Sequence, residues 1–225
     1  GQENVKKKLG FYLKAFEKTG VSPFLGFFGA KGLGKTEFAN AYARNLKNQD
    51  GSTRPRVEIN CSTIKNNDCF FEQIFIPLIL ENEVTVIFDE AHELPRDLTM
   101  ALLTILDTRS SHLREFNWKE TVFPFDFKKQ TFLFATTESD KLFPPLKDRL
   151  TSVDFDPYTA DQLGEIISRF IECDISDSAL KQLSTIVRGN ARNAIMRAKD
   201  INLYIASEGL SKFTLSDYNK FCDIL

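Results

Sequence analysis

The sequence contains, between residues 29 and 36, the stretch Gly29-Ala30-Lys31-Gly32-Leu33-Gly34-Lys35-Thr36, which fits G-x-x-x-x-G-K-[ST] at every fixed position. Glycines allow backbone conformations that a Cβ would forbid, so successive N–H groups can point at phosphate oxygens beside the positive end of a helix dipole. In this pattern the lysine reaches the β- and γ-phosphates, and the threonine hydroxyl is a ligand of Mg²⁺. We call this stretch the P-loop.

The residues on either side of the P-loop agree with this interpretation. The apolar run from Phe24 to Phe28 precedes it, and a helix-compatible segment runs from Glu37 to Leu46. The order strand, glycine-rich turn, helix is the one that phosphate binding requires. The sequence therefore predicts a nucleoside triphosphate site that consists of the P-loop together with Glu37 in the first helical turn.

The composition limits the classes of protein that fit. With 225 residues and 42% hydrophobic residues, the chain is long enough for a buried core, and its net charge of −2 gives no bulk attraction for a polyanion. The four cysteines are scattered without a C-x-x-C pair, as in reduced thiols of an intracellular, cytoplasmic protein. The polar start is not a signal peptide, and no apolar run is long enough to span a membrane.

A second motif follows the P-loop. The run Val84-Thr85-Val86-Ile87-Phe88 has the β-branched and aromatic composition of a strand that is buried on both faces of a parallel sheet. It ends in Asp89 and Glu90, at the sheet edge where open α/β sheets bind ligands. After a P-loop, Asp89 is expected to hold Mg²⁺ through its water shell, and Glu90 to deprotonate the attacking water. We interpret the nearby His92 as a surface or packing residue.

The rest of the chain alternates strand and helix patterns and then becomes helical. We expect a short strand at 56–60, a helix capped by Asp68, a helix over 97–106, a protruding hairpin over 112–127 around Trp118, and strands at 131–135 and 153–155. From Tyr158 onward the apolar spacing is helical almost throughout. We therefore expect an α/β nucleotide-binding domain over residues 1–156 and a helical domain over 157–225.

Taken together, these motifs resemble the AAA+ ATPases and, within them, the RuvB family of Holliday-junction branch-migration motors. Besides the P-loop, the matching segments are Phe88-Asp89-Glu90-Ala91-His92, Ala135-Thr136-Thr137, Pro145-Leu146-Lys147-Asp148-Arg149 and Arg188-Gly189-Asn190-Ala191-Arg192-Asn193. The resemblance implies a P-loop AAA+ core with a five-stranded parallel sheet, in which the strand ending at Thr137 lies between the two motif strands, plus a small all-helical lid.

The resemblance also implies roles for single residues. Thr137 would be sensor 1, Arg149 an arginine finger that acts on the neighbouring subunit's ATP, and Arg192 the sensor 2 of the lid. Tyr158 would border the adenine pocket, and Asn60 is a candidate to hold Glu90 out of line. A finger that acts in trans implies a head-to-tail ring, hexameric by the same resemblance, or a helical assembly.

The resemblance leaves the substrate open. DNA is expected for a branch-migration motor, whereas a helicase-loader or clamp-loader type of ATPase would act on a partner protein docked at the Trp118 hairpin. A scaffold with negligible turnover is disfavoured by the presence of Lys35, Glu90 and Arg149. The resemblance ends before the winged-helix DNA-binding domain of the RuvB family, and the hairpin differs in sequence from that of the family.

Overall fold

The structure is a computed structural model that describes residues 1–107 and 112–224. The chain forms two compact units, which are described separately. The α/β unit consists of Glu3–Gly29 and Lys35–Phe155; the helical unit consists of Gly1–Gln2, Ala30–Gly34 and the chain from Asp156 onward. None of the helices in the described residues is long and apolar enough to cross a membrane.

The α/β unit is built on a five-stranded parallel sheet with the strand order β2-β3-β6-β1-β7. Its strands are β1 (Leu25–Phe28), β2 (Arg56–Asn60), β3 (Val84–Asp89), β6 (Gln130–Thr136) and β7 (Thr151–Asp154). Strand β6 lies between β1 and β3, so the expected insertion of the sensor strand between the two motif strands is confirmed. The carboxyl ends of β1, β3 and β6 therefore lie side by side at one edge.

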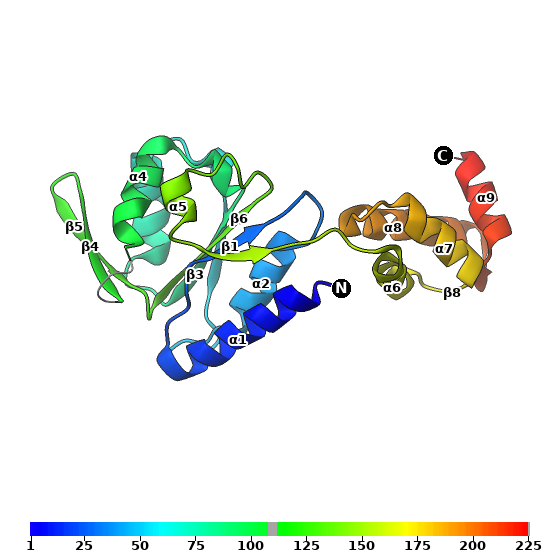
Figure 1. The fold of residues 1–225 in the computed structure, drawn as a ribbon, viewed down its shortest axis with the longest axis horizontal. Helices are drawn as coiled ribbons and strands as arrows, with labels where there is room; N and C mark the ends of the chain where they lie inside the picture. The colour runs from blue at the N-terminus through cyan, green and yellow to red at the C-terminus, as the bar shows by residue number, and fades with distance from the viewer. Residues whose placement is uncertain (108–111, 225) are drawn as a thin grey trace. The chain divides into compact units, whose positions relative to one another are not determined.

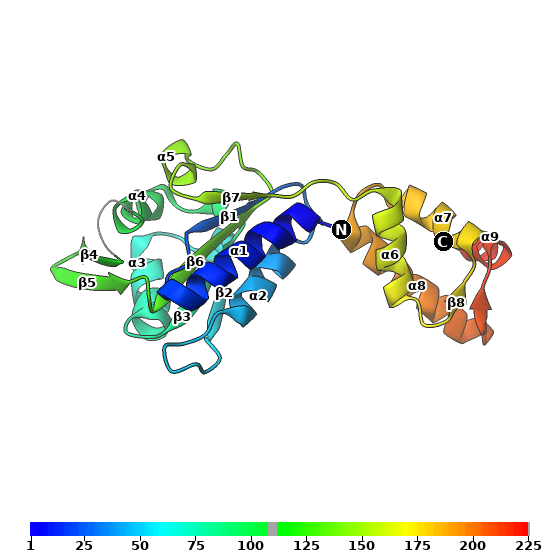
Figure 2. The ribbon, with the colours of Figure 1, turned by 60° about the horizontal axis from the view of Figure 1, so that its bottom comes forward.

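Helices cover both faces of this sheet, which explains why β6 is buried along its whole length. Figures 1 and 2 show α1 (Glu3–Thr19) and α2 (Lys35–Asn45) on one face and α4 (Arg96–Ile105) on the other. The short helices α3 (Asn67–Phe70) and α5 (Pro144–Lys147) and the turns η1 (Cys61–Thr63) and η3 (Ala91–Glu93) complete the connections.

The segment after β2 differs from the expected simple helix. It starts at Asn66, whose side chain accepts a hydrogen bond from the Cys69 N–H, so Asn66 and not Asp68 is the N-cap. After α3 the backbone widens into a π-helix, η2 (Phe71–Ile79), which contains Pro77. Because proline has no N–H to donate, it cannot take part in a regular α-helical ladder.

The hairpin consists of β4 (Leu113–Trp118) and β5 (Thr121–Asp126), paired antiparallel. One face of it packs on η2, where the ring of Phe71 stacks with those of Phe116, Trp118 and Phe123 at centroid distances of 5.5, 5.1 and 5.8 Å. The expected hairpin is confirmed, and Trp118 is half-buried in this stack.

The helical unit contains α6 (Ala160–Phe170), α7 (Asp177–Ile186), α8 (Ala191–Glu208) and α9 (Leu215–Ile224) around a core of its own. A two-residue parallel pair, β8 (Asp174–Ile175) with β9 (Lys212–Phe213), was not expected. Ser176 is the N-cap of α7, and Thr159 caps α6 in a capping box with Gln162.

Candidate nucleotide site

The P-loop forms the turn between β1 and α2. All three of its glycines have positive φ angles, 152° at Gly29, 82° at Gly32 and 94° at Gly34, which residues with a Cβ rarely adopt. The Lys35 side chain is buried, and its Nζ donates a hydrogen bond to the Gly29 carbonyl at 2.7 Å. The turn thus has the backbone geometry that the motif predicts, with the ammonium group folded over its first residue.

The middle of the P-loop, Ala30–Gly34, belongs to the helical unit. Three successive carbonyls accept hydrogen bonds from that unit: Lys31 from Asn190 Nδ2 (3.3 Å), Gly32 from Arg192 N (3.2 Å) and Leu33 from Tyr158 Oη (3.1 Å). A Cβ on Gly32 would overlap the carboxamide of Asn190, so glycine is required there by space as well as by φ. Two predicted residues, Tyr158 and Arg192, are thereby bonded to the loop itself.

Thr36 and Asp89 converge at the edge where β1 and β3 end. The Thr36 hydroxyl donates to the Asp89 carboxylate, with oxygen–oxygen distances of 3.2 and 3.3 Å. Burial raises the pKa of Asp89, and the carboxylates of Glu90 and Glu58 raise it further. A bound cation would stabilise the charged form of Asp89 and so oppose this rise. A hydroxyl and a carboxylate are oxygen ligands of the kind Mg²⁺ prefers, so these residues fit that ion.

Glu90 follows β3 in a left-handed conformation, with φ 51° and ψ 50°. A non-glycine residue in this region is uncommon, and such strain is often found at functional sites. The conformation turns the Glu90 side chain toward the end of β6, where the Thr137 hydroxyl donates to Glu90 Oε2 at 3.1 Å. The predicted base and the predicted sensor 1 are thus directly hydrogen-bonded.

His92 lies beside Glu90 in η3, and its side chain is only 6% exposed. Its ring contacts Thr136 Oγ1 (2.8 Å) and Glu90 Oε2 (3.6 Å) through Nδ1, and Glu93 Oε1 (3.2 Å) and Glu138 Oε1 (3.4 Å) through Nε2. Of the two interpretations of His92, surface or packing, this burial excludes the first. The cluster is not a metal site either, since no group of three or more His, Cys, Asp or Glu side chains within 1–107 and 112–224 is arranged to hold one.

The remaining predicted residues have other partners in this structure. The Asn60 side-chain oxygen accepts hydrogen bonds from Ser62 N and Ser62 Oγ, at 3.1 and 2.8 Å, so it caps η1 instead of contacting Glu90. Arg149 donates to the carbonyls of Leu103 and Pro145, at 3.1 and 2.8 Å. Glu37 is exposed in the first turn of α2.

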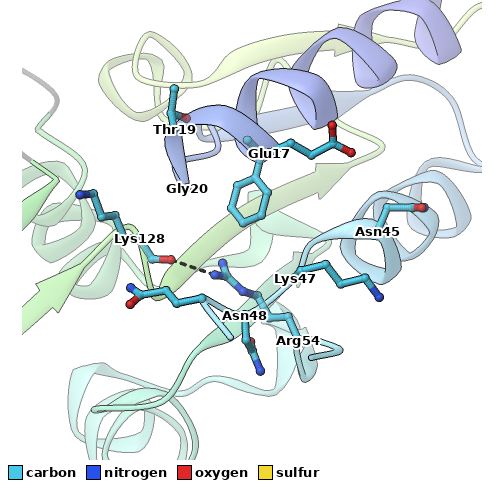
Figure 3. A pocket seen from close by; sticks show the side chains of 10 residues that line it. Glu17, Thr19, Gly20, Asn45, Lys47, Asn48, Arg54 and Lys128 are labelled. Atoms are coloured by element: carbon cyan, nitrogen blue, oxygen red, sulfur yellow. Dashed lines mark hydrogen bonds between the residues drawn. The ribbon is translucent and has the colours of Figure 1, made fainter. Parts of the chain in front are cut away.

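A separate cavity of about 630 Å³ lies in the α/β unit and contains none of the predicted site residues. Figure 3 shows the buried Arg54 in it, donating to the Lys128 carbonyl at 2.8 Å. Arg54 precedes β2 and Lys128 precedes β6, so the cavity lies at the amino ends of the strands. It is therefore at the opposite edge of the sheet from Thr36 and Asp89.

Two residues contribute to this site in ways that the local sequence did not predict, His92 and Asn190. His92 stands three positions after Asp89, and the carboxylates gathered around its ring could not be read from local sequence. Asn190 belongs to a recognised motif, but its role in capping α8 and in holding the P-loop was not foreseen. The signal for Asn190 was available, because asparagine directly before a helical segment is a strong N-cap candidate.

Comparison with known proteins agrees with this geometry. The chain is 30% identical over 207 residues to the Holliday junction branch migration complex subunit RuvB of Thermotoga petrophila, and this match covers 89% of the chain and 59% of that protein. It is 28% identical over 185 residues to the Lon protease of Chloroflexus aggregans, covering 76% of the chain and 22% of that protein. The chain thus spans about 59% of the length of the RuvB protein it matches.

A solved RuvB structure and a family model also match this chain. The structure of the Thermotoga maritima RuvB Holliday junction branch migration motor matches with a TM-score of 0.81 at 25% identity, over 100% of this chain and 70% of that chain. Residues 25–157 match the model of the ATPase family associated with various cellular activities, AAA. That segment includes the P-loop, Asp89, Glu90, Thr137 and Arg149. The chain is a member of the AAA family.

Proposed function

We propose that this chain is an AAA+ ATPase that hydrolyses ATP at the subunit interfaces of a ring or helical oligomer to remodel DNA, most like a RuvB-type branch-migration motor in the cytoplasm. In this proposal residues 1–156 bind the nucleotide and residues 157–225 form the lid. The observation that carries it is the convergence of Thr36, Asp89, Glu90 and Thr137 at one sheet edge, next to a P-loop. The likeness to RuvB over 89% of the chain supports DNA as the substrate.

The chemistry follows from the positions of these groups. The P-loop N–H groups and Lys35 hold the β- and γ-phosphates, while Thr36 and Asp89 would hold Mg²⁺, which offsets phosphate charge. Glu90 accepts a proton from the attacking water as the oxygen–phosphorus bond forms and the bond between the γ-phosphorus and the β–γ bridging oxygen breaks, which releases ADP and phosphate. Thr137 holds the Glu90 carboxylate and reaches toward the same water.

Three further residues complete the proposed site. Arg149 acts on the ATP of the neighbouring subunit, where a cation on the developing phosphoryl charge is worth about 10³–10⁵ in rate. Arg192 and Tyr158 connect the nucleotide to the lid. The bond from the Tyr158 hydroxyl to the Leu33 carbonyl supports this for Tyr158, whereas the Arg192 bond to the Gly32 carbonyl comes from its main-chain N–H. Asn60 would have to leave Ser62 before it could contact Glu90.

Glu90→Gln tests the hydrolytic assignment. Because glutamine cannot accept the proton, we expect kcat to fall about 10²–10⁴-fold while ATP remains bound. The measurement is steady-state phosphate release together with retention of labelled ATP on the protein. Glu208→Gln, an exposed change on α8, is the control and should turn over normally. Unchanged phosphate release by Glu90→Gln would refute the assignment.

The substrate is tested by adding DNA. ATPase activity per subunit should rise with protein concentration as the oligomer forms, and a four-way DNA junction should raise it further at a fixed protein concentration. The second candidate function, a loader that acts on a partner protein, predicts stimulation by that protein and none by DNA. It is favoured by the outer face of the hairpin, where Leu113 and Val122 are 53% and 52% exposed.

A further inference from the structure

His92 is the centre of a cluster that surrounds the proposed catalytic base. Its Nε2 faces two carboxylate oxygens, those of Glu93 and Glu138, at 3.2 and 3.4 Å. The two carboxylates beside Nε2 favour a proton on that nitrogen. This fixes the orientation of the ring and leaves Nδ1 on the side of Glu90 and Thr136.

The Nδ1 side of the ring joins the ends of two strands. Nδ1 is 2.8 Å from the hydroxyl of Thr136 on β6 and 3.6 Å from Glu90 Oε2, which follows β3. The same Thr136 hydroxyl accepts a hydrogen bond from the Glu138 N–H at 3.0 Å, so it is held in place independently of His92. Thr136 is fully buried, and this end of the cluster is therefore rigid.

The cluster also explains why three glutamates can lie together. Glu90, Glu93 and Glu138 all lie within 3.6 Å of one imidazole, and Lys141 also pairs with Glu138. The Lys141 hydrogen bond is the main cause that lowers the pKa of Glu138, and His92 adds to it. Without the imidazole, the carboxylates of Glu93 and Glu138 would repel that of Glu90. The hydrogen bond from Thr137 would then be what still holds the Glu90 carboxylate in this cluster.

We propose that His92 is a positioning residue for hydrolysis: its ring, anchored by the hydrogen bond with Thr136, keeps the Glu90 carboxylate, which Thr137 bonds, at the orientation that deprotonates the attacking water. The proposal rests on the role of Glu90 proposed above. His92 itself does not touch the nucleotide in this account, and it transfers no proton. Its effect is to keep the base aligned and to stand between it and the two neighbouring carboxylates.

The experiment compares His92→Ala with wild type at one protein concentration, with the oligomeric state checked in parallel. We expect kcat for ATP to fall about 10–100-fold, as for a misplaced catalytic group, while the KM for ATP changes by less than about twofold. His92→Gln, whose amide can donate toward Glu93 and Glu138 but cannot reproduce both ring nitrogens, should recover part of the loss. His112→Ala, at the more exposed second histidine, is the matched control and should leave both parameters unchanged.

A double variant separates positioning from general damage. In Glu90→Gln the base is already lost, so adding His92→Ala should slow phosphate release no further. Multiplicative losses in the double variant, or a wild-type kcat for His92→Ala, would overturn the proposal.

A substitute variant and the result for Glu90→Gln show which of the two proposals a negative result would refute. If His92→Ala does not fold, Thr136→Val serves instead, because it removes the hydroxyl on Nδ1 while nearly keeping the side-chain volume; it should also lower kcat at constant KM. If Glu90→Gln itself hydrolyses ATP normally, the proposed function fails. If Glu90→Gln is inactive but His92→Ala is not, only the present inference fails.

Discussion

The hydroxyl of Tyr42 lies in the interior of the α/β unit, 2.8 Å from that of Ser22. Burial raises the pKa of Tyr42 to about 12, from an ordinary value of 10.0. The unfolded chain therefore loses this proton near pH 10, while the folded chain keeps it until about pH 12. The corresponding stability is fully present below pH 10 and is lost as the pH rises through this window.

Tyr42→Phe should therefore flatten the alkaline loss of stability. The difference of about 2 between the two pKa values corresponds to about 2–3 kcal/mol in the free energy of unfolding between pH 10 and pH 12. Urea unfolding at several pH values measures it. Burial, together with Cys222, also raises the pKa of Tyr218 to about 12, and Tyr218→Phe in the helical unit should flatten the alkaline loss in the same direction. Parallel pH curves for wild type and Tyr42→Phe would contradict the prediction.

Residues were predictable from the sequence where their chemistry depends on neighbours in the chain. Gly32, Lys35 and Thr36 are specified by a fixed local spacing, and Asp89 by its place at the end of a buried strand. The setting of His92 was not predictable, because its carboxylate partners include Glu138, which is far away in sequence. Its burial depends on the register of β3 against β6, which a single sequence does not contain.

At the scale of single elements, the π-helix η2 and the hairpin form one aromatic cluster. Phe71 is fully buried and stacks with rings from both hairpin strands. Removing a buried phenylalanine side chain costs about 3–5 kcal/mol, so Phe71→Ala should lower the free energy of unfolding by that amount. Because Trp118 is the single tryptophan, its fluorescence emission should shift to the red as its stacking partner is lost.

Phe11→Ala is the matched control for this change. The Phe11 side chain is 65% exposed on α1, so its removal should alter stability by less than about 0.5 kcal/mol and leave the Trp118 emission unchanged. If Phe71→Ala kept the wild-type emission maximum, the packing of the hairpin on η2 would be wrong.

Element types were predicted better than element details. The strands and the hairpin follow from apolar alternation and β-branched runs, but alternation alone does not say which face of a hairpin packs inward, so the stacking of Trp118 on Phe71 was not predictable. The segment after Asn66 was expected to be an ordinary helix capped by Asp68. Pro77 was the available sign against a regular helix there, since it cannot donate to the ladder.

At the scale of the whole molecule, the proposed trans action of Arg149 predicts complementation between inactive subunits. Lys35→Ala lacks the phosphate-binding ammonium, and Arg149→Ala lacks the finger, so each protein alone should be nearly inactive. In a mixed oligomer, an Arg149→Ala subunit keeps an intact P-loop and receives Arg149 from a Lys35→Ala neighbour. Mixing the two should therefore restore phosphate release at those interfaces.

The controls for mixing are each variant alone at the same total concentration, and a mixture of Lys35→Ala with a Lys35→Ala/Arg149→Ala double variant, which contains no intact P-loop. Neither should recover activity. If Arg149→Ala alone turned over at the wild-type rate, or if the complementing mixture stayed inactive while oligomers formed, the finger would not act in trans.

The middle of the P-loop is anchored to the helical unit by hydrogen bonds from Asn190, Arg192 and Tyr158 to three consecutive carbonyls. A gain or loss of the terminal phosphate would displace the peptide groups that bind it, and these same peptide groups are the attachment points of the helices. In a motor, the conformational change would then begin at the bound nucleotide itself and pass directly to the helices. Its timing would be set by phosphate release.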